Sequence, residues 1–319
     1  MSMTPEQAAW FRDTFTRLVD NVDEALLGKR EVVGLVLAAM LAEGHVLLED
    51  APGTGKTSLA KALAASVQGT STRIQFTPDL LPSDVTGVTI YDQQNHRFEF
   101  HRGPVFASIV LADEINRASP KTQSALLEAM EEHQVSMDGR TMPLPRPFMV
   151  VATQNPVEMD GTFPLPEAQR DRFMAQISMG YPSARAELDM LLHHGEKDPL
   201  DTLRPVASAD DVEHAIDAIA SLHTSDALRQ YVVDLVAATR SHPSLRLGAS
   251  PRSSLQLLRA ARAHAAIAGR DHALPEDVAA MAPAVLSHRV LMNRAQRDET
   301  PGDVVRHLVE TVAVPSASR

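Results

Sequence analysis

Between about positions 45 and 180 the chain alternates short apolar runs with helical patterns, and this alternation most limits the folds open to it. The apolar runs have the length and composition of buried strands. They lie at 45–49, 73–76, 108–112, 148–153 and 176–179. Strands separated by helices require crossover connections, so the strands should run parallel with helices on both faces of the sheet. The pattern therefore predicts an α/β sandwich around a mostly parallel five-stranded sheet.

Two pairs of apolar segments interrupt this alternation and are predicted to form hairpins. The first pairs residues 88–91 with 97–101, and the second pairs 135–137 with 140–142. Asp138 and Gly139 lie between the strands of the second pair, and an Asp-Gly dipeptide readily adopts the positive φ angles of a tight turn. Both hairpins would be additions to the layered sheet.

After position 182 the sequence becomes rich in alanine and leucine at helical spacing and contains no convincing strand. Helices are expected at 184–195, 210–222, 225–241, 251–268, 275–286 and 302–313. A chain of 319 residues is long enough for about two domains. We therefore expect an α/β domain over 1–182 and an all-α domain over 183–319.

Composition excludes several classes of function. The formal net charge of −11 argues against a general nucleic-acid or anionic-membrane surface, because such surfaces need cations to neutralise phosphates. The chain has no cysteine, which rules out disulfides, thiolate metal sites and cysteine nucleophiles, and which fits a reducing compartment.

The N-terminal segment lacks a basic stretch followed by an apolar one, so a signal peptide is not expected. It is more typical of a helix capped by Thr4, with Pro5 at the first position and Gln7 completing a capping box. The most apolar window, 32–48, is interrupted by polar residues from Glu43 onward and is too short to span a bilayer. We expect a soluble, cytoplasmic protein without membrane insertion.

The first strand runs directly into EDAPGTGKTSLAKAL at 49–63, a glycine-containing loop followed by a helix. Such a loop presents backbone N–H groups and a helix N-terminus to phosphate, while Lys56 reaches the β and γ phosphates and Thr57 offers its hydroxyl to Mg²⁺. The strict pattern has glycine at position 50, where this chain has Asp50, and a plain glycine turn is the alternative interpretation. The residues expected to bind ATP here are Pro52, Gly53, Thr54, Gly55, Lys56, Thr57 and Ser58.

Two adjacent carboxylates, Asp113 and Glu114, follow the third predicted strand. An unpaired carboxylate is costly to bury, so the pair should be solvated or neutralised by a cation. Alone, such a pair usually marks the solvated start of a loop. Next to a phosphate loop, Mg²⁺ bound to ATP is the expected cation, with Asp113 holding the metal and Glu114 polarising the attacking water.

Further candidate site residues lie between the fourth and the fifth predicted strands. Asn155 follows the fourth strand and could orient a water, although an Asn before Pro156 is also a common turn residue. Arg170 and Arg172 precede the fifth strand, and an arginine there could stabilise a transferring phosphoryl group in a neighbouring molecule. A surface salt bridge is the alternative for either arginine.

In the helical half, Ser250 and Pro251 have the sequence of a helix start, and Arg252 follows at once. A cation in the first turn opposes the helix dipole and is better explained by a nearby anion. That anion could be a bound phosphate or an acidic side chain.

Taken together, these segments resemble the MoxR family of AAA+ ATPases over most of the chain. The segments that carry the resemblance are LLGKREVV, HVLLEDAPGTGKT, TPDLLPSDVTG, FHRGPVF, LADEINRASPKTQSALLEAMEEHQV, ATQNPVE, FPLPEAQRDRF and GASPRS. The resemblance implies a P-loop αβα sandwich followed by an all-α lid. It implies these roles: Lys56 and Thr57 as Walker A, Asp113 and Glu114 as Walker B, Asn155 as sensor 1, Arg172 as arginine finger, Arg252 as sensor 2, and Gly28 at the adenine pocket.

Arg170 departs from the family pattern PEAQxDRF and leaves open which arginine is the finger. The two hairpins look like the family's insert in the second helix and the one before sensor 1. The resemblance further implies a homo-oligomeric ring, a hexamer, that hydrolyses ATP with Mg²⁺ to remodel or mature protein clients. It also implies a partner with a von Willebrand type A domain, in metal insertion or complex assembly. The alternative functions are a helicase-type AAA+ nucleic-acid motor, which the acidic charge counts against, and a non-catalytic nucleotide sensor.

Overall fold

The computed structural model describes residues 4–49, 53–154, 161–185, 187–188, 199–293 and 299–315. Its centre is a five-stranded sheet in the order β2-β5-β8-β1-β9, with every neighbouring pair parallel. The strands are β1 (Val46–Glu49), β2 (Ser71–Gln75), β5 (Ile109–Asp113), β8 (Met149–Gln154) and β9 (Ala175–Ile177). The predicted α/β sandwich is confirmed, and each strand lies within two residues of its expected bounds at either end.

Helices cover both faces of this sheet because alternate residues of its central strands face two different cores. In β1, Val46 and Leu48 contribute to the core shared with the first three helices, while Leu47 faces the core on the other side. β5 and β8 show the same alternation. The helices of this half are α1 (Pro5–Ala25), α2 (Arg30–Leu41), α3 (Lys56–Ser66), α4 (Pro82–Thr86), α5 (Pro120–Glu132) and α6 (Glu167–Arg170), with the short 3₁₀ turn η1 (Ile115–Arg117).

The start of α1 is the predicted capping box. The Thr4 amide donates to Oε1 of Gln7 at 2.8 Å, and the Gln7 amide donates to Oγ1 of Thr4 at 3.2 Å. Two donors that the helix leaves unpaired are thereby satisfied.

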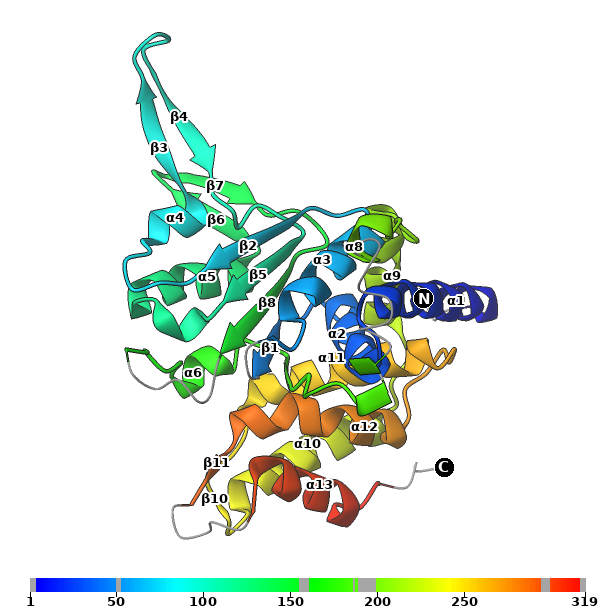
Figure 1. Ribbon diagram of the computed structural model, residues 1–319. Helices are drawn as coiled ribbons and strands as arrows, with labels where there is room; N and C mark the ends of the chain where they lie inside the picture. Colours follow the sequence, from blue (N-terminus) through cyan, green and yellow to red (C-terminus); the bar gives the residue numbers. More distant parts are fainter. Residues whose placement is uncertain are drawn as a thin grey trace.

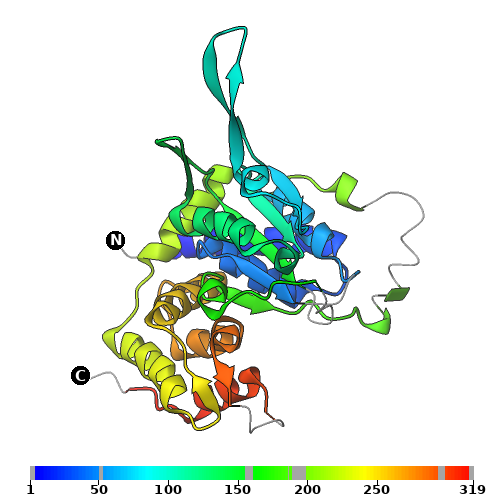
Figure 2. The same ribbon diagram turned by 90° about the vertical axis from the view of Figure 1, so that its left-hand side faces the viewer.

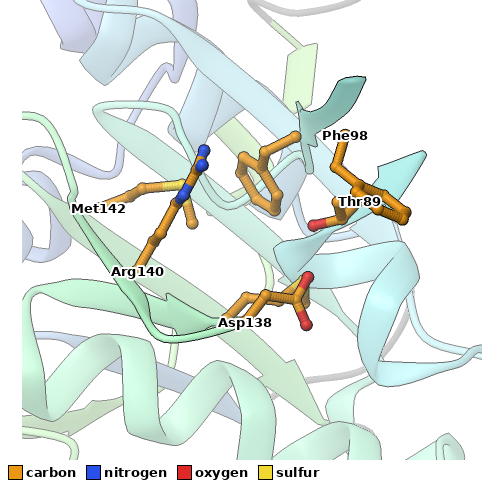
Figure 3. A pocket seen from close by; sticks show the side chains of 7 residues that line it. Thr89, Phe98, Asp138, Arg140 and Met142 are labelled. Atoms are coloured by element: carbon orange, nitrogen blue, oxygen red, sulfur yellow. The ribbon is translucent and has the colours of Figure 1, made fainter. Parts of the chain in front are cut away.

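Both predicted hairpins are present. β3 (Gly87–Asp92) pairs with β4 (Arg97–Arg102), and β6 (Gln134–Met137) pairs with β7 (Arg140–Pro143) through Asp138 and Gly139 at φ 52° and 73°. Figures 1 and 2 show the β3–β4 hairpin extending from the end of the molecule far from the C-terminal helices. A cavity of about 430 Å³ lies between the two hairpins, and Figure 3 shows its apolar and charged lining.

The C-terminal part is helical, as expected. Its helices are α8 (Pro199–Thr202), α9 (Ala209–Ser221), α10 (Asp226–Ser241), α11 (Pro251–Ile267), α12 (Pro275–Leu286) and α13 (Pro301–Thr311), with the 3₁₀ turn η2 (Ser287–Arg289). Two short strands, β10 (Leu245–Leu247) and β11 (Leu291–Met292), also pair there and were not predicted. The helix expected at 184–195 falls largely outside the described residues.

The C-terminal helices pack directly on the sandwich: α11 lies against α2 (Figure 1), and α12 lies against β9. The larger hydrophobic core consequently runs without interruption from α1 to α13. The domain boundary between 182 and 183 stays a prediction. Within the described ranges, none of the helices has both the length and the apolar character needed to cross a bilayer.

Candidate active site

The phosphate loop ends where α3 begins, at the carboxyl end of β1. Gly55 is the N-cap residue of α3 and has φ 91°, and Gly53 has φ 79°. A residue with a side chain would be strained at either φ angle, which explains the two glycines. Lys56, Thr57 and Ser58 follow as the first residues of α3, so the N-terminus of this helix lies at the predicted phosphate-binding loop. Asp50 and Pro52 lie outside the described residues.

The LLGKR segment lies against this loop. Leu26 is close enough to Gly55 that a Cβ there would meet it at 3.1 Å. Lys29 is buried, and its Nζ donates to the carbonyl oxygens of Met179 and Gly180 at 2.6 and 2.8 Å. These contacts place Gly28, with φ 76°, between the phosphate loop and the segment after β9.

The acidic pair lies at the carboxyl end of β5, where Thr153 of the neighbouring strand β8 contacts both residues. The Thr153 hydroxyl donates to Oδ1 of Asp113 at 2.6 Å and accepts the Glu114 amide at 2.9 Å. Glu114 has φ 55°, so its side chain leaves the strand in a different direction from that of Asp113. Thr153 is 1% exposed and therefore fixes this geometry from inside the sheet.

Protein side chains already neutralise both acids. Arg73 on β2 donates from Nη2 to Oδ2 of Asp113 at 2.6 Å. Oε2 of Glu114 accepts from Gln75 Nε2 at 2.9 Å and from Arg117 Nη1 at 3.0 Å. Two guanidinium groups, those of Arg73 and Arg117, thus lie at this strand end beside the acids. The inference that a magnesium nucleotide also supplies positive charge here stays a prediction.

Hydrogen bonds to Glu49, the last residue of β1, link this strand to its two neighbours, β8 and β9. Gln154 of β8 donates to it at 2.9 Å, and Gln176 of β9 donates to its other oxygen. Asn155, the predicted water-orienting residue, follows Gln154 but lies outside the described residues. Thr153 and Gln154 were not singled out from the sequence, where they are only the last residues of an apolar strand.

The two remaining predicted residues, Arg172 and Arg252, meet each other at one acidic side chain. Arg172 donates from Nη2 to Oε2 of Glu131 at 3.1 Å, and Arg252 donates to the other oxygen, Oε1. They line a cavity of about 330 Å³ whose wall includes His45 and Met174, the residues directly before β1 and β9. The acidic side chain, one of the two anions considered for Arg252, is therefore a partner of this arginine.

This pair of arginines lies at the opposite edge of the sheet from the phosphate loop. His45 and Met174 mark the amino ends of β1 and β9, whereas the loop, Asp113 and Glu114 lie at carboxyl ends of strands. All strands of the sheet run parallel, so the two ends form separate edges. The fold thus brings together Gly28, the loop, Asp113 and Glu114 on one edge, and Arg172 with Arg252 on the other.

Arg170 points elsewhere. It lines a different cavity, of about 690 Å³, together with Glu49, Gln176 and Arg306. Its Nε is buried without a hydrogen-bond partner. Of the two neighbouring arginines, therefore, only Arg172 shares a cavity with Arg252 in the part of the chain that the structure describes.

The residues at the carboxyl edge fit a magnesium ion that arrives with a nucleotide. Thr57 and Asp113 offer hydroxyl and carboxylate oxygens, the ligands that Mg²⁺ prefers, and α3 packs against β5. Across the described ranges, no cluster of three or more His, Cys, Asp or Glu residues could hold a metal alone. Two protein oxygens leave most of an octahedral shell to phosphate and water.

Comparison with known proteins defines the class. Residues 45–175 match the ATPase family associated with various cellular activities (AAA), and residues 237–308 match the AAA lid domain. The sandwich and the helices after it are therefore an AAA+ ATPase fold with its lid. A crystal structure of a candidate ATPase from Cytophaga hutchinsonii superimposes with a TM-score of 0.90 at 37% identity, covering 98% of both chains.

Relatives of full length narrow this class to one family. The uncharacterized YeaC protein of Bacillus subtilis is 49% identical over 94% of both chains. The chaperone MoxR1 of Mycobacterium tuberculosis is 44% identical over 96% of this chain and 83% of its own. The chain belongs to the MoxR family of AAA+ ATPases and is an enzyme that hydrolyses ATP.

Proposed function

We propose that this protein is a chaperone-like motor that remodels or matures protein clients with energy from Mg-ATP hydrolysis at sites shared between copies. The separation of the two predicted halves of the site supports this most strongly. Lys56, Asp113 and Glu114 lie at the carboxyl edge of the sheet, while Arg172 lies at its amino edge. One copy cannot bring both edges to one nucleotide, whereas two copies packed edge to edge in a ring can.

Within one copy, the loop and the N-terminus of α3 bind the phosphates, and Lys56 contacts the β and γ groups. Thr57 and Asp113 would hold Mg²⁺, which when bound offsets phosphate charge. Glu114 orients the attacking water and accepts its proton, and it must loosen its contacts with Gln75 or Arg117 to do so. Asn155 is assigned as a second group that orients the water.

The neighbouring copy supplies Arg172 and Arg252. Guanidinium groups suit the charge that spreads over the γ phosphate during transfer, because each has several donors in a fixed plane. Hydrolysis would then depend on assembly. This assignment makes Arg172 the finger and leaves Arg170 without a role in catalysis.

The proposed oligomeric state, compartment and partner are based on membership of the MoxR family. We propose a hexameric, cytoplasmic ring that acts with a protein bearing a von Willebrand type A domain in metal insertion or complex assembly. The relative MoxR1 is named a chaperone, which supports clients that are proteins. The acidic net charge of −11 also favours protein over nucleic acid as the substrate of the motor.

The first test is Glu114→Gln. The amide keeps the shape of the side chain but cannot accept a proton, so ATP should bind normally while turnover falls about a hundredfold or more. Isothermal titration calorimetry and a phosphate-release assay measure the two effects. The same variant should retain a client in ATP, and mass spectrometry of captured proteins should show a set that Lys56→Ala does not retain.

Glu128→Gln is the matched control, because Glu128 is an exposed carboxylate of α5 that does not line the cavity of Arg172 and Arg252. It should behave as wild type. Turnover by Glu114→Gln close to the wild-type rate would refute the catalytic assignment, and identical captures by Glu114→Gln and Lys56→Ala would refute the client-bound motor.

A further inference from the structure

Glu131, near the C-terminal end of α5, joins the two arginines of the amino edge. Its two carboxylate oxygens are divided between them, Oε2 to Arg172 and Oε1 to Arg252. All three side chains are only about one-third exposed: 33% for Glu131, 31% for Arg172 and 38% for Arg252. Glu131 thus lies between two guanidinium groups from different parts of the chain, the segment before β9 and the start of α11.

A second acidic residue fixes the backbones of these two segments. Asp171 accepts the Ser250 hydroxyl at 2.9 Å and Nε of Arg289 at 2.8 Å. The Arg289 side chain is 1% exposed, so this second contact is in the interior. Arg172 and Arg252 each lie within two residues of this junction, and their Cα positions are therefore set independently of Glu131.

What Asp171 does not set is the direction of the two guanidinium groups. Two cations on neighbouring backbones repel, and with no anion between them they would turn apart into solvent. A carboxylate that accepts one Nη2 group from each holds them side by side. Each guanidinium has five N–H donors, and Glu131 accepts from only one nitrogen of each, so the geometry of this contact allows both groups to bind another anion as well.

We infer that Glu131 is a positioning residue that holds Arg172 and Arg252 as one phosphate-binding unit for the nucleotide of a neighbouring copy. This inference rests on the proposed shared site and adds a residue to it. Glu131 does not touch the nucleotide; it acts through the two arginines. It should therefore affect the rate of hydrolysis and not the binding of ATP at the phosphate loop.

The test is steady-state ATP hydrolysis by the full-length Glu131→Gln protein, at a concentration where its oligomeric state equals that of the wild type. We expect kcat to fall about tenfold with KM within about twofold, because the lost interaction operates in the transition state. Glu131→Asp, which keeps the charge, should recover part of the rate. Adding Glu131→Gln to Arg252→Ala should cause little further loss, since the two residues act as one unit.

Glu132→Gln is the matched control on the adjacent exposed glutamate and should leave kcat unchanged. A purely structural role for Glu131 predicts a lower Tm and losses that add fully to those of Arg252→Ala, and that result would overturn the inference. So would wild-type turnover by Glu131→Gln.

The proposed function fails separately. If Arg172→Ala keeps wild-type turnover, the shared site is wrong and the inference falls with it. If Arg172→Ala is inactive while Glu131→Gln is fully active, the shared site stands and the role of Glu131 alone is refuted.

Discussion

The buried hydroxyl of Thr153 contacts both acidic residues at the end of β5. It donates to Asp113 and accepts the amide of Glu114, so one side chain orients both acids. We therefore expect this threonine to matter for turnover although it contacts no substrate.

Replacing Thr153 with valine keeps the shape of the side chain and removes the hydroxyl. The Glu114 amide loses its acceptor, which should reduce the free energy of unfolding by about 1–3 kcal/mol. A displacement of about 1 Å at a catalytic group can cost about a hundredfold, so turnover should fall by about tenfold to a hundredfold. Chemical denaturation and the phosphate-release assay measure the two effects.

Thr153→Ser is the control, because it keeps the hydroxyl and should retain most of the activity. Full activity in the valine variant would show that Asp113 and Glu114 are oriented by other contacts.

The acids themselves were predictable from their position after an apolar strand, but their partners were not. Arg73 and Gln75 lie on β2, which pairs with β5 in the register Gln75 to Asp113. Strand order and register depend on the whole sheet, and a single sequence does not reveal which edge strand adjoins β5. For that reason the sequence alone does not predict that Arg73 contacts Asp113.

At the scale of elements, a buried acidic residue links α11 and α12, two helices of the lid that pack against each other. Asp277, in the first turn of α12, is fully buried and accepts hydrogen bonds from His264 of α11 at 2.6 Å, from Arg270 at 2.6 Å and from the Leu274 amide at 2.7 Å. Burial alone would raise the pKa of Asp277, but these hydrogen bonds lower it to about 2.

The pKa of Asp277 predicts a pH dependence of stability. A carboxyl whose pKa is lower in the folded than in the unfolded chain stabilises the fold above its ordinary value of 3.8 and loses that effect as pH falls toward 2. Asp277→Asn should therefore reduce the free energy of unfolding at pH 7 by about 3 kcal/mol, because the buried ion pair with Arg270 is broken. The difference from wild type should shrink between about pH 4 and pH 2.

Urea denaturation at several pH values measures this, with Asp226→Asn, a fully exposed first-turn residue of α10, as the control. A difference that stays constant down to pH 2 would contradict the assigned pKa.

Helices and strands were predicted from the sequence where the segment was long enough to show a periodic pattern of apolar residues. The five sheet strands, both hairpins and the helices from α9 to α13 follow from apolar spacing and caps. The strands β10 and β11 were not predicted, because two or three residues carry no period and their pairing joins segments that are more than forty residues apart.

At the scale of the whole molecule, the parallel sheet separates the site into two edges. The phosphate loop and both acids lie at the carboxyl edge, and the unit of Arg172, Arg252 and Glu131 lies at the amino edge. The sequence identified the candidate site residues but not their division between two edges of the sheet. The position of Arg252 depends on how the lid packs against α2 and β9, which the sequence does not reveal. In the proposed shared site, one hydrolytic event therefore needs residues from at least two copies.

The most direct measurement mixes two inactive proteins. Under the proposed assignment, Lys56→Ala impairs the phosphate loop and Arg172→Ala removes the finger, so each protein alone should show almost no turnover. Random mixing in equal amounts forms about one intact interface in four, and the mixture should recover activity in that proportion. If exchange of subunits is shown by fluorescence energy transfer and no activity returns, the shared site is contradicted.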